Sequence, residues 1–133
     1  MLKKPVIKCV FFDLDGTLLD TAPDLLNACN YVLAVHQHPQ VSISEFCRWV
    51  HGGIAMMIGE SFKIRPQHAE FPALKAAFLD YYQQHSIEQT QLFPGIADLL
   101  RYLQQNQIPW GIVTNKISTL THPILEHFRL KEH

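Results

Sequence analysis

Apolar residues change their spacing several times along the chain, and each change marks an expected element. Residues 6–12, VIKCVFF, are nearly all apolar, with β-branched and aromatic side chains, and the run ends at Asp13. A continuous apolar run of this length predicts a strand that is buried on both faces of a parallel sheet. Residues 110–114, WGIVT, have the same character and predict a second buried strand.

Helical spacing dominates the residues between these two strands. Apolar stripes with a helical period predict helices that begin at or near Thr21, Ser42, Ile54 and Pro72. The first of them has Pro23 in its first turn, where a missing amide donor costs little. Ser42 and Glu45 have the spacing of a capping box at the start of the second. The segment HQHPQ, residues 36–40, is the expected break between these two helices.

Two more helices should flank the second strand. One begins at Pro94-Gly95 and has an apolar inner face made of Ile96, Leu99, Leu100 and Leu103. The other follows the strand, with candidate N-terminal caps at Ser118, Thr119 and Thr121. Pro123 is acceptable only in the first turn of that last helix, because an interior proline removes a backbone hydrogen bond.

The order of these elements predicts an α/β protein. We expect residues 1–20 and 90–133 to form a core around a parallel sheet, and residues 21–89 to form an inserted helical bundle. Ligands of such sheets bind beyond the carboxyl ends of the strands. Asp13 and Thr114 stand at these two strand ends, so we expect the chemistry there.

Composition limits the classes of function. The 133 residues are 47% hydrophobic and 17% charged, which is typical of a folded domain, and the net charge of −1 with scattered basic residues favours neither nucleic-acid nor membrane-surface binding. No apolar run approaches the roughly 20 residues of a membrane helix. The basic start with its short apolar run looks only faintly like a signal peptide. Three widely spaced cysteines fit a reducing cytosol, so we expect a cytoplasmic protein.

Asp13 and Asp15 admit three interpretations. Alternate side chains of an extended segment point the same way, so both can face one site, and Gly16 gives the backbone freedom to turn after them. The plainest interpretation is that they are solvated turn residues, since Asp-Gly is common in turns. A calcium loop that starts at Asp13 fails, because its sixth position would be Leu18 and its twelfth Asp24.

Phosphoryl transfer is the third interpretation. A carboxylate can attack phosphorus and form an aspartyl-phosphate, which divides a difficult hydrolysis into two steps. Attack by an anion on an anionic ester requires a cation, normally Mg²⁺. A second carboxylate nearby can protonate the leaving oxygen and then activate water.

The segment DLDGTLLDT, residues 13–21, resembles the DxDGT signature of the haloacid dehalogenase superfamily, in its phosphatase branch. The resemblance implies a Rossmann-like parallel-sheet core with an inserted α-helical cap. It implies that Asp13 is the nucleophile and that the side chain of Asp15 is the general acid and base. Mg²⁺ would be bound by the Asp13 carboxylate and by the backbone carbonyl of Asp15.

The segment GIVTNK, residues 111–116, is similar to the second motif of the superfamily, a hydrophobic strand that ends in Ser or Thr. The resemblance implies that Thr114 hydrogen-bonds the transferring phosphoryl group, although a threonine at a strand end is by itself more often a structural cap. Asn115 and Lys116 lie beside this position and are lesser candidates for binding phosphate or substrate, with solvated loop residues as the alternative.

A closer resemblance is to phosphoglycolate phosphatases and their near relatives. It is carried by the segments FDLDGTLLDTAPDL, WVHGGIAMMIGESF, LFPGIADLLRYL and GIVTNK. It implies a small phosphorylated metabolite as substrate and a cap that closes over the phosphate. Arg48, His51 and Lys63 are candidates for contacting a substrate carboxylate, with surface charges on amphipathic helices as the plainer interpretation.

Two features of the superfamily have no match after Thr114: the third-motif lysine and the fourth-motif acidic residues that complete the Mg²⁺ site. Lys116 comes too early, and Lys131 has no matching motif around it. We therefore expect the N-terminal portion of a longer phosphatase, impaired by itself, whose exposed sheet edges pair in a homo-oligomer. The alternatives are a non-catalytic relative that serves as a binding or oligomerisation module, and a phosphomutase or pyrophosphatase of the same superfamily.

Overall fold

The computed structural model describes residues 6–131, so the basic cluster at the start of the chain lies outside the described residues. Within this range the elements follow one another as β1 (Val10–Phe12), β2 (Leu19–Asp20), α1 (Ala22–Val35), α2 (Ile43–Phe46), the 3-10 helix η1 (Val50–Gly52), α3 (Gly53–Phe62), α4 (Phe71–His85), β3 (Gln91–Leu92), α5 (Ile96–Gln105), β4 (Trp110–Ile112) and α6 (Ser118–His127). None of the helices in residues 6–131 combines the length and apolarity needed to cross a membrane.

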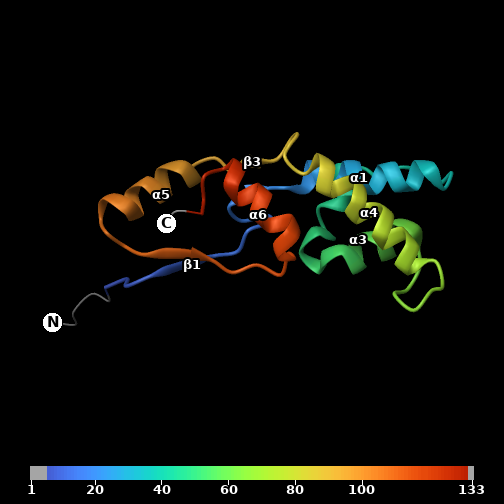
Figure 1. The fold of residues 1–133 in the computed structure, drawn as a ribbon, viewed down its shortest axis with the longest axis horizontal. Coiled ribbons are helices and arrows are strands. Elements are labelled where there is room, and N and C mark those ends of the chain that lie inside the picture. The colour runs from blue at the N-terminus through green and yellow to red at the C-terminus, as the bar shows by residue number, and fades with distance from the viewer. Residues whose placement is uncertain (1–5, 132–133) are drawn as a thin grey trace.

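The two strands expected from the sequence pair in parallel. Val10 lies opposite Trp110 and Phe12 opposite Ile112, and the amide of Val113 donates to the carbonyl of Phe12 at 2.8 Å. The parallel α/β arrangement is therefore confirmed. Because the two strands end side by side, the residues that follow them enter the same region of the molecule. Figure 1 shows β1 and β4 together at one end and the helices α1, α3 and α4 gathered at the other, with α6 between.

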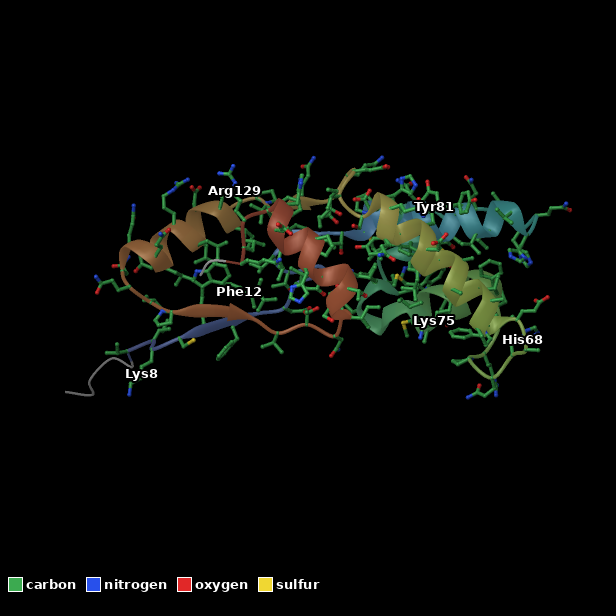
Figure 2. All side chains as sticks on the ribbon, viewed as in Figure 1. Lys8, Phe12, His68, Lys75, Tyr81 and Arg129 are labelled. Atoms are coloured by element: carbon green, nitrogen blue, oxygen red, sulfur yellow. The ribbon has the colours of Figure 1, made fainter. Side chains whose placement is uncertain are left out.

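The expectation that β1 is buried on both faces is wrong. Val10 and Phe12 pack against a cluster that includes Leu103 of α5, and Figure 2 shows Phe12 between the sheet and α5. Phe11 points to the opposite face and is 70% exposed. The continuous apolar run does not distinguish these cases, because helices cover only one face of this pair of strands. The strand is also shorter than expected, since residues 6–9 have no regular secondary structure.

A short antiparallel pairing of β2 with β3 was not predicted. Leu19 lies opposite Leu92, and Asp20 lies opposite Gln91. Strands of two residues carry no measurable period in the sequence, so the pattern analysis could not find them. The pairing joins the segment that enters the helical block to the segment that leaves it.

The helical block is built around α1 and α4, whose buried faces meet in one apolar core. That core includes Leu25, Leu33, Leu74, Phe78 and Tyr82. The expected cap of α2 is confirmed, since the Ser42 hydroxyl accepts from the amide of Glu45 at 3.4 Å. Cys29 is buried in this core and burial raises the pKa of its thiol, whereas Cys9 and Cys47 are exposed.

The start of α6 differs from the expectation. Its N-cap is Ile117 rather than Ser118, Thr119 or Thr121, and Pro123 lies inside the helix instead of in its first turn. The proline therefore removes one backbone donor from the helix interior. The hydroxyl of Thr121, one turn into the helix, donates to the carbonyls of Lys116 and Ile117 at 3.2 and 3.0 Å.

Candidate active site

A tight loop after β1 presents the two aspartates. Leu14 between them is completely buried, so Asp13 and Asp15 point away from the core. The loop is closed by backbone bonds from the amide of Gly16 to the carbonyl of Leu19 at 2.9 Å and from the amide of Leu19 to the carbonyl of Leu14 at 3.1 Å. Gly16 has φ +79°, a conformation that glycine adopts without strain.

The aspartates line a cleft of about 380 Å³ between the sheet end and the helical block. The residues expected from the two sequence motifs all line this cleft: Asp13, Asp15, Thr114, Asn115 and Lys116. The structure thus brings together five side chains that are about 100 positions apart in two groups. The opposite wall comes from the helical block and includes His51, Lys75 and Tyr82.

Asp15 is held at one oxygen. The hydroxyl of Thr21 donates to Asp15 Oδ1 at 2.7 Å, and Nζ of Lys116 donates to the same oxygen at 3.0 Å. The Lys116 side chain is only 7% exposed and that of Asp15 is 20% exposed. Lys116, expected from the sequence to bind phosphate or substrate, is therefore paired with the second aspartate in this structure.

Tyr82 of α4 covers this ion pair. Nζ of Lys116 lies 4.7 Å from the centre of the Tyr82 ring, within the range of a cation–π contact. The Tyr82 hydroxyl is buried and has no hydrogen-bond partner among residues 6–131. Burial, together with the negative charges of Asp15 and Asp24, raises the pKa of Tyr82 well above its usual range, so the phenol stays neutral.

Thr114 and Asn115 differ in their setting. Thr114 is partly buried, and its Oγ1 accepts from the amide of Lys116 at 3.1 Å, which leaves the hydroxyl proton available to donate into the cleft. Asn115 is exposed at the cleft. A threonine that accepts from the backbone two residues later fits the cap interpretation and still has a donor for a ligand.

Asp24 ties together the two connections between the helical block and the rest of the chain. Its carboxylate is 1% exposed and accepts from the amide of Gln89, from the amide of Thr90 at 2.8 Å and from the hydroxyl of Thr90 at 2.7 Å. Since Asp24 lies in the first turn of α1 and Thr90 follows α4, these bonds close the base of the block. An acidic residue in a first helical turn is ordinary, so no pattern in the sequence marks Asp24 for this role.

Only one of the three basic residues expected to contact a substrate carboxylate lines the cleft. His51 lines the cleft, but Nζ of Lys63 lies 5.7 Å from the centre of the Trp49 ring, and Arg48 is exposed in the turn between α2 and η1. Lys75 of α4 (Figure 2) lines the cleft and was missed. It lies on a helix face with apolar neighbours, and only the packing of α4 identifies which side faces the site.

The oxygen groups at the sheet end fit a hard cation. Mg²⁺ is commonly held by one or two carboxylates together with substrate phosphate and water. The Asp13 carboxylate is exposed in the cleft. Asp15, whose backbone carbonyl is the second expected ligand, lines the same cleft. Residues 6–131 contain no group of three or more His, Cys, Asp or Glu side chains arranged to hold a metal ion. Ligands from the described residues would therefore be few, and phosphate would complete the shell.

Replacing Gly16 by Ala should strain the loop and displace His51. The residue has φ +79°, and an added Cβ would lie 2.8 Å from Cε1 of His51. We expect a loss of about 1–2 kcal/mol in the free energy of unfolding from the left-handed backbone. Gly95→Ala is the matched control, because Gly95 has φ +86° and its added Cβ would meet nothing within 4 Å.

Urea unfolding and the imidazole NMR signals measure the two effects separately. Both variants should lose similar stability, because the exposed ring of His51 can move aside, but only Gly16→Ala should shift the His51 signal. An unchanged His51 signal in Gly16→Ala would contradict the close approach of this ring to the loop.

The chain is similar to proteins of a known family. Residues 10–133 match a family model described as "haloacid dehalogenase-like hydrolase". An N-acetylmuramic acid 6-phosphate phosphatase of Pseudomonas putida is 36% identical over 126 residues, which cover 95% of this chain and 56% of that protein. A phosphoglycolate phosphatase of Xanthomonas campestris is 38% identical over 118 residues, which cover 89% of this chain and 53% of that protein.

Solved structures share the architecture. The crystal structure of a predicted phosphoglycolate phosphatase from Haemophilus somnus superposes with a TM-score of 0.77 at 27% identity, covering 91% of this chain and 57% of that one. A haloacid dehalogenase-like hydrolase from Bacteroides fragilis has a TM-score of 0.84 at 17% identity, which supports the fold. The chain spans between half and two thirds of the length of these relatives.

Proposed function

Because the chain belongs to the haloacid dehalogenase-like hydrolase family, we propose that its cleft hydrolyses phosphate monoesters through an aspartyl-phosphate. The observation that carries the proposal is the joint placement of Asp13, Asp15 and Thr114 on one cleft at the ends of two parallel strands. In this proposal residues 21–89 form a cap over a core made of residues 1–20 and 90–133, and the protein works in the cytoplasm.

The chemistry proceeds in two balanced steps. A carboxylate oxygen of Asp13 attacks phosphorus, the bond from phosphorus to the ester oxygen breaks, and Asp15 gives its proton to the departing alcohol. A water molecule then attacks the phosphorus of the aspartyl-phosphate and passes a proton to Asp15, while the bond from phosphorus to the Asp13 oxygen breaks. This releases inorganic phosphate and restores both carboxyl groups. Thr114 donates its hydroxyl proton to a phosphoryl oxygen and so orients the group in both steps.

Magnesium is the cofactor that fits this cleft. Asp13 and the backbone carbonyl of Asp15 would hold it, and when bound it offsets the repulsion between the carboxylate and the anionic ester. The remaining tasks of the site fall to side chains of this protein. They orient the phosphate through Thr114 and place the two carboxyl groups beside it.

The substrate we propose is a small phosphorylated metabolite of the phosphoglycolate type. The names of the relatives describe enzymes for phosphoglycolate and for N-acetylmuramic acid 6-phosphate, and both of these compounds contain a carboxylic acid. His51 and Lys75 face the cleft from the helical block and are suited to an anionic group remote from the phosphate. This proposal replaces Arg48 and Lys63 as candidates for that contact.

Hydrolysis of p-nitrophenyl phosphate and 2-phosphoglycolate by the purified 133-residue chain, with and without Mg²⁺, tests the proposal. We expect slow turnover that requires Mg²⁺, because the chain has no match to the third-motif lysine or the fourth-motif acidic residues. If a folded sample hydrolyses neither compound, the described cleft is insufficient for catalysis, and a binding or oligomerisation role becomes the better interpretation.

We also propose that the chain forms a homo-oligomer through its sheet. β1 and β4 pair only with each other among residues 6–131, and Phe11 and Val113 are exposed at 70% and 64%. Unpaired strand edges and exposed apolar side chains favour association. Sedimentation velocity should show a dimer or larger species, and Phe11→Lys should shift it toward monomer. A monomeric wild-type chain at micromolar concentration would contradict this proposal.

A further inference from the structure

We propose that Lys116 is a positioning residue, which orients the carboxylate of Asp15 and does so only while Tyr82 of the helical block covers it. The inference rests on the proposed function, since it assigns a consequence to the proton transfer by Asp15. It differs from the expectation that Lys116 binds the phosphate. The three groups come from the loop after β1, the loop after β4 and helix α4.

Two side chains hydrogen-bond the same carboxylate oxygen of Asp15. Thr21 and Lys116 both donate to Oδ1, at 2.7 and 3.0 Å, while Oδ2 accepts no hydrogen bond from residues 6–131. Two donors on one oxygen restrict rotation of the carboxylate about its last bond. The remaining oxygen is thereby kept in one direction, as a group that exchanges a proton with a leaving alcohol requires.

Burial explains why Lys116 stays with Asp15. The lysine side chain is 7% exposed, and the Asp15 carboxylate is its ion-pair partner in the described part of the chain. Separating a largely buried ammonium from its partner is costly, because its desolvation is then no longer offset by the ion pair. The backbone of Lys116 is fixed as well, since its amide donates to Thr114 Oγ1.

Tyr82 connects this pair to the helical block. Its ring lies 4.7 Å from Nζ of Lys116 and excludes water from one side of the ammonium. If α4 moved away, water would reach Lys116 and weaken its attraction to Asp15, because the effective dielectric constant would rise. The orientation of the Asp15 carboxylate therefore depends on the packing of the helical block against the sheet end.

Two esters with different leaving groups separate positioning from phosphate binding. p-Nitrophenol leaves readily without a proton, whereas the alcohol released from 2-phosphoglycolate needs one. If Lys116 orients Asp15, Lys116→Met should lower kcat for 2-phosphoglycolate at least about tenfold more than kcat for p-nitrophenyl phosphate, since general acid catalysis contributes 10²–10⁴-fold. If Lys116 binds the phosphoryl group, both values should fall by the same factor.

Lys75→Met is the matched control. It removes the same charge from the same cleft, but Lys75 has no hydrogen bond or ion pair with Asp15. Because Lys75 is proposed to contact the carboxylate of 2-phosphoglycolate, its loss should raise KM for that ester and leave the ratio of the two kcat values unchanged. Tyr82→Leu, which removes the ring, should change the ratio in the same direction as Lys116→Met. Tyr82→Phe keeps the ring and removes only a hydroxyl that has no partner in the described part of the chain, so its ratio should match the wild type.

Hydrogen–deuterium exchange gives a readout that does not depend on turnover. Lys116→Met should raise the exchange of residues 14–21 about tenfold relative to Lys75→Met, because the loop loses one of its two side-chain anchors. A selective loss of kcat on 2-phosphoglycolate together with raised loop exchange supports the inference. An equal loss on both esters overturns it, as does unchanged exchange. If the wild-type chain hydrolyses neither ester, the proposed function has failed, and the exchange result alone decides whether Lys116 anchors the loop.

Discussion

Replacing Asp13 by Asn is expected to abolish phosphate-ester hydrolysis, with a loss in kcat on the order of 10⁴-fold or more. An amide lacks the anionic oxygen that attacks phosphorus, and no other carboxylate of the described chain stands at the end of β1 with the same exposure. Asp13 is exposed and its side chain makes no hydrogen bond within residues 6–131, so the change should alter the free energy of unfolding by less than about 0.5 kcal/mol.

Activity on p-nitrophenyl phosphate with Mg²⁺ measures the loss, and thermal unfolding measures the stability. Acid-quenched samples of the wild-type chain should carry phosphate on the peptide that contains Asp13, and samples of Asp13→Asn should not. Asp80→Asn, a change of an exposed aspartate on α4, is the control for the loss of one negative charge. Activity above about one per cent of wild type in Asp13→Asn, from a preparation free of other phosphatases, would remove Asp13 from the role of nucleophile.

The position of the cleft could be predicted from the sequence, because short local patterns mark the two strand ends that form it. The ends of two apolar runs locate Asp13 and Thr114, and parallel pairing of these runs then follows from the helical block between them. The residues that support the cleft could not be predicted in this way. Tyr82 belongs to an apolar stripe like any other, and its contact with Lys116 joins positions 34 residues apart through tertiary packing.

Errors in the expected elements have equally specific causes. Burial of Phe11 was inferred from its apolar neighbours, but exposure depends on what covers a sheet face, and the sequence of the strand does not encode this. Pro123 was expected to mark the first turn of α6, yet the helix begins five residues earlier at Ser118. Local rules give the cost of an interior proline, whereas packing of Leu120 and Ile124 into the core decides whether the helix tolerates it.

Replacing Asp24 by Ala is expected to cause a large loss of stability, about 3 kcal/mol in the free energy of unfolding. The carboxylate accepts the amide protons of Gln89 and Thr90 and the hydroxyl proton of Thr90 in a region where Thr90 is 5% exposed. Without it the amides of Gln89 and Thr90 lose their acceptor, and an unsatisfied buried group such as the Thr90 amide costs about 1–3 kcal/mol. The Thr90 hydroxyl retains an acceptor, the carbonyl of Ser86 at 3.1 Å.

Urea unfolding followed by circular dichroism measures this loss, with Asp80→Ala as the matched control on an exposed site. The control should change stability by less than about 0.5 kcal/mol. The stability of Asp24→Asn should lie between those of Asp24→Ala and Asp80→Ala. Its side-chain amide keeps one accepting oxygen but places an NH2 donor against the amide donors of Gln89 and Thr90. Since domains are stable by only about 5–15 kcal/mol, Asp24→Ala should also raise hydrogen exchange at residues 86–92 first. Equal stability of Asp24→Ala and Asp80→Ala would mean that the helical block is held at its base by the pairing of β2 with β3 rather than by this carboxylate.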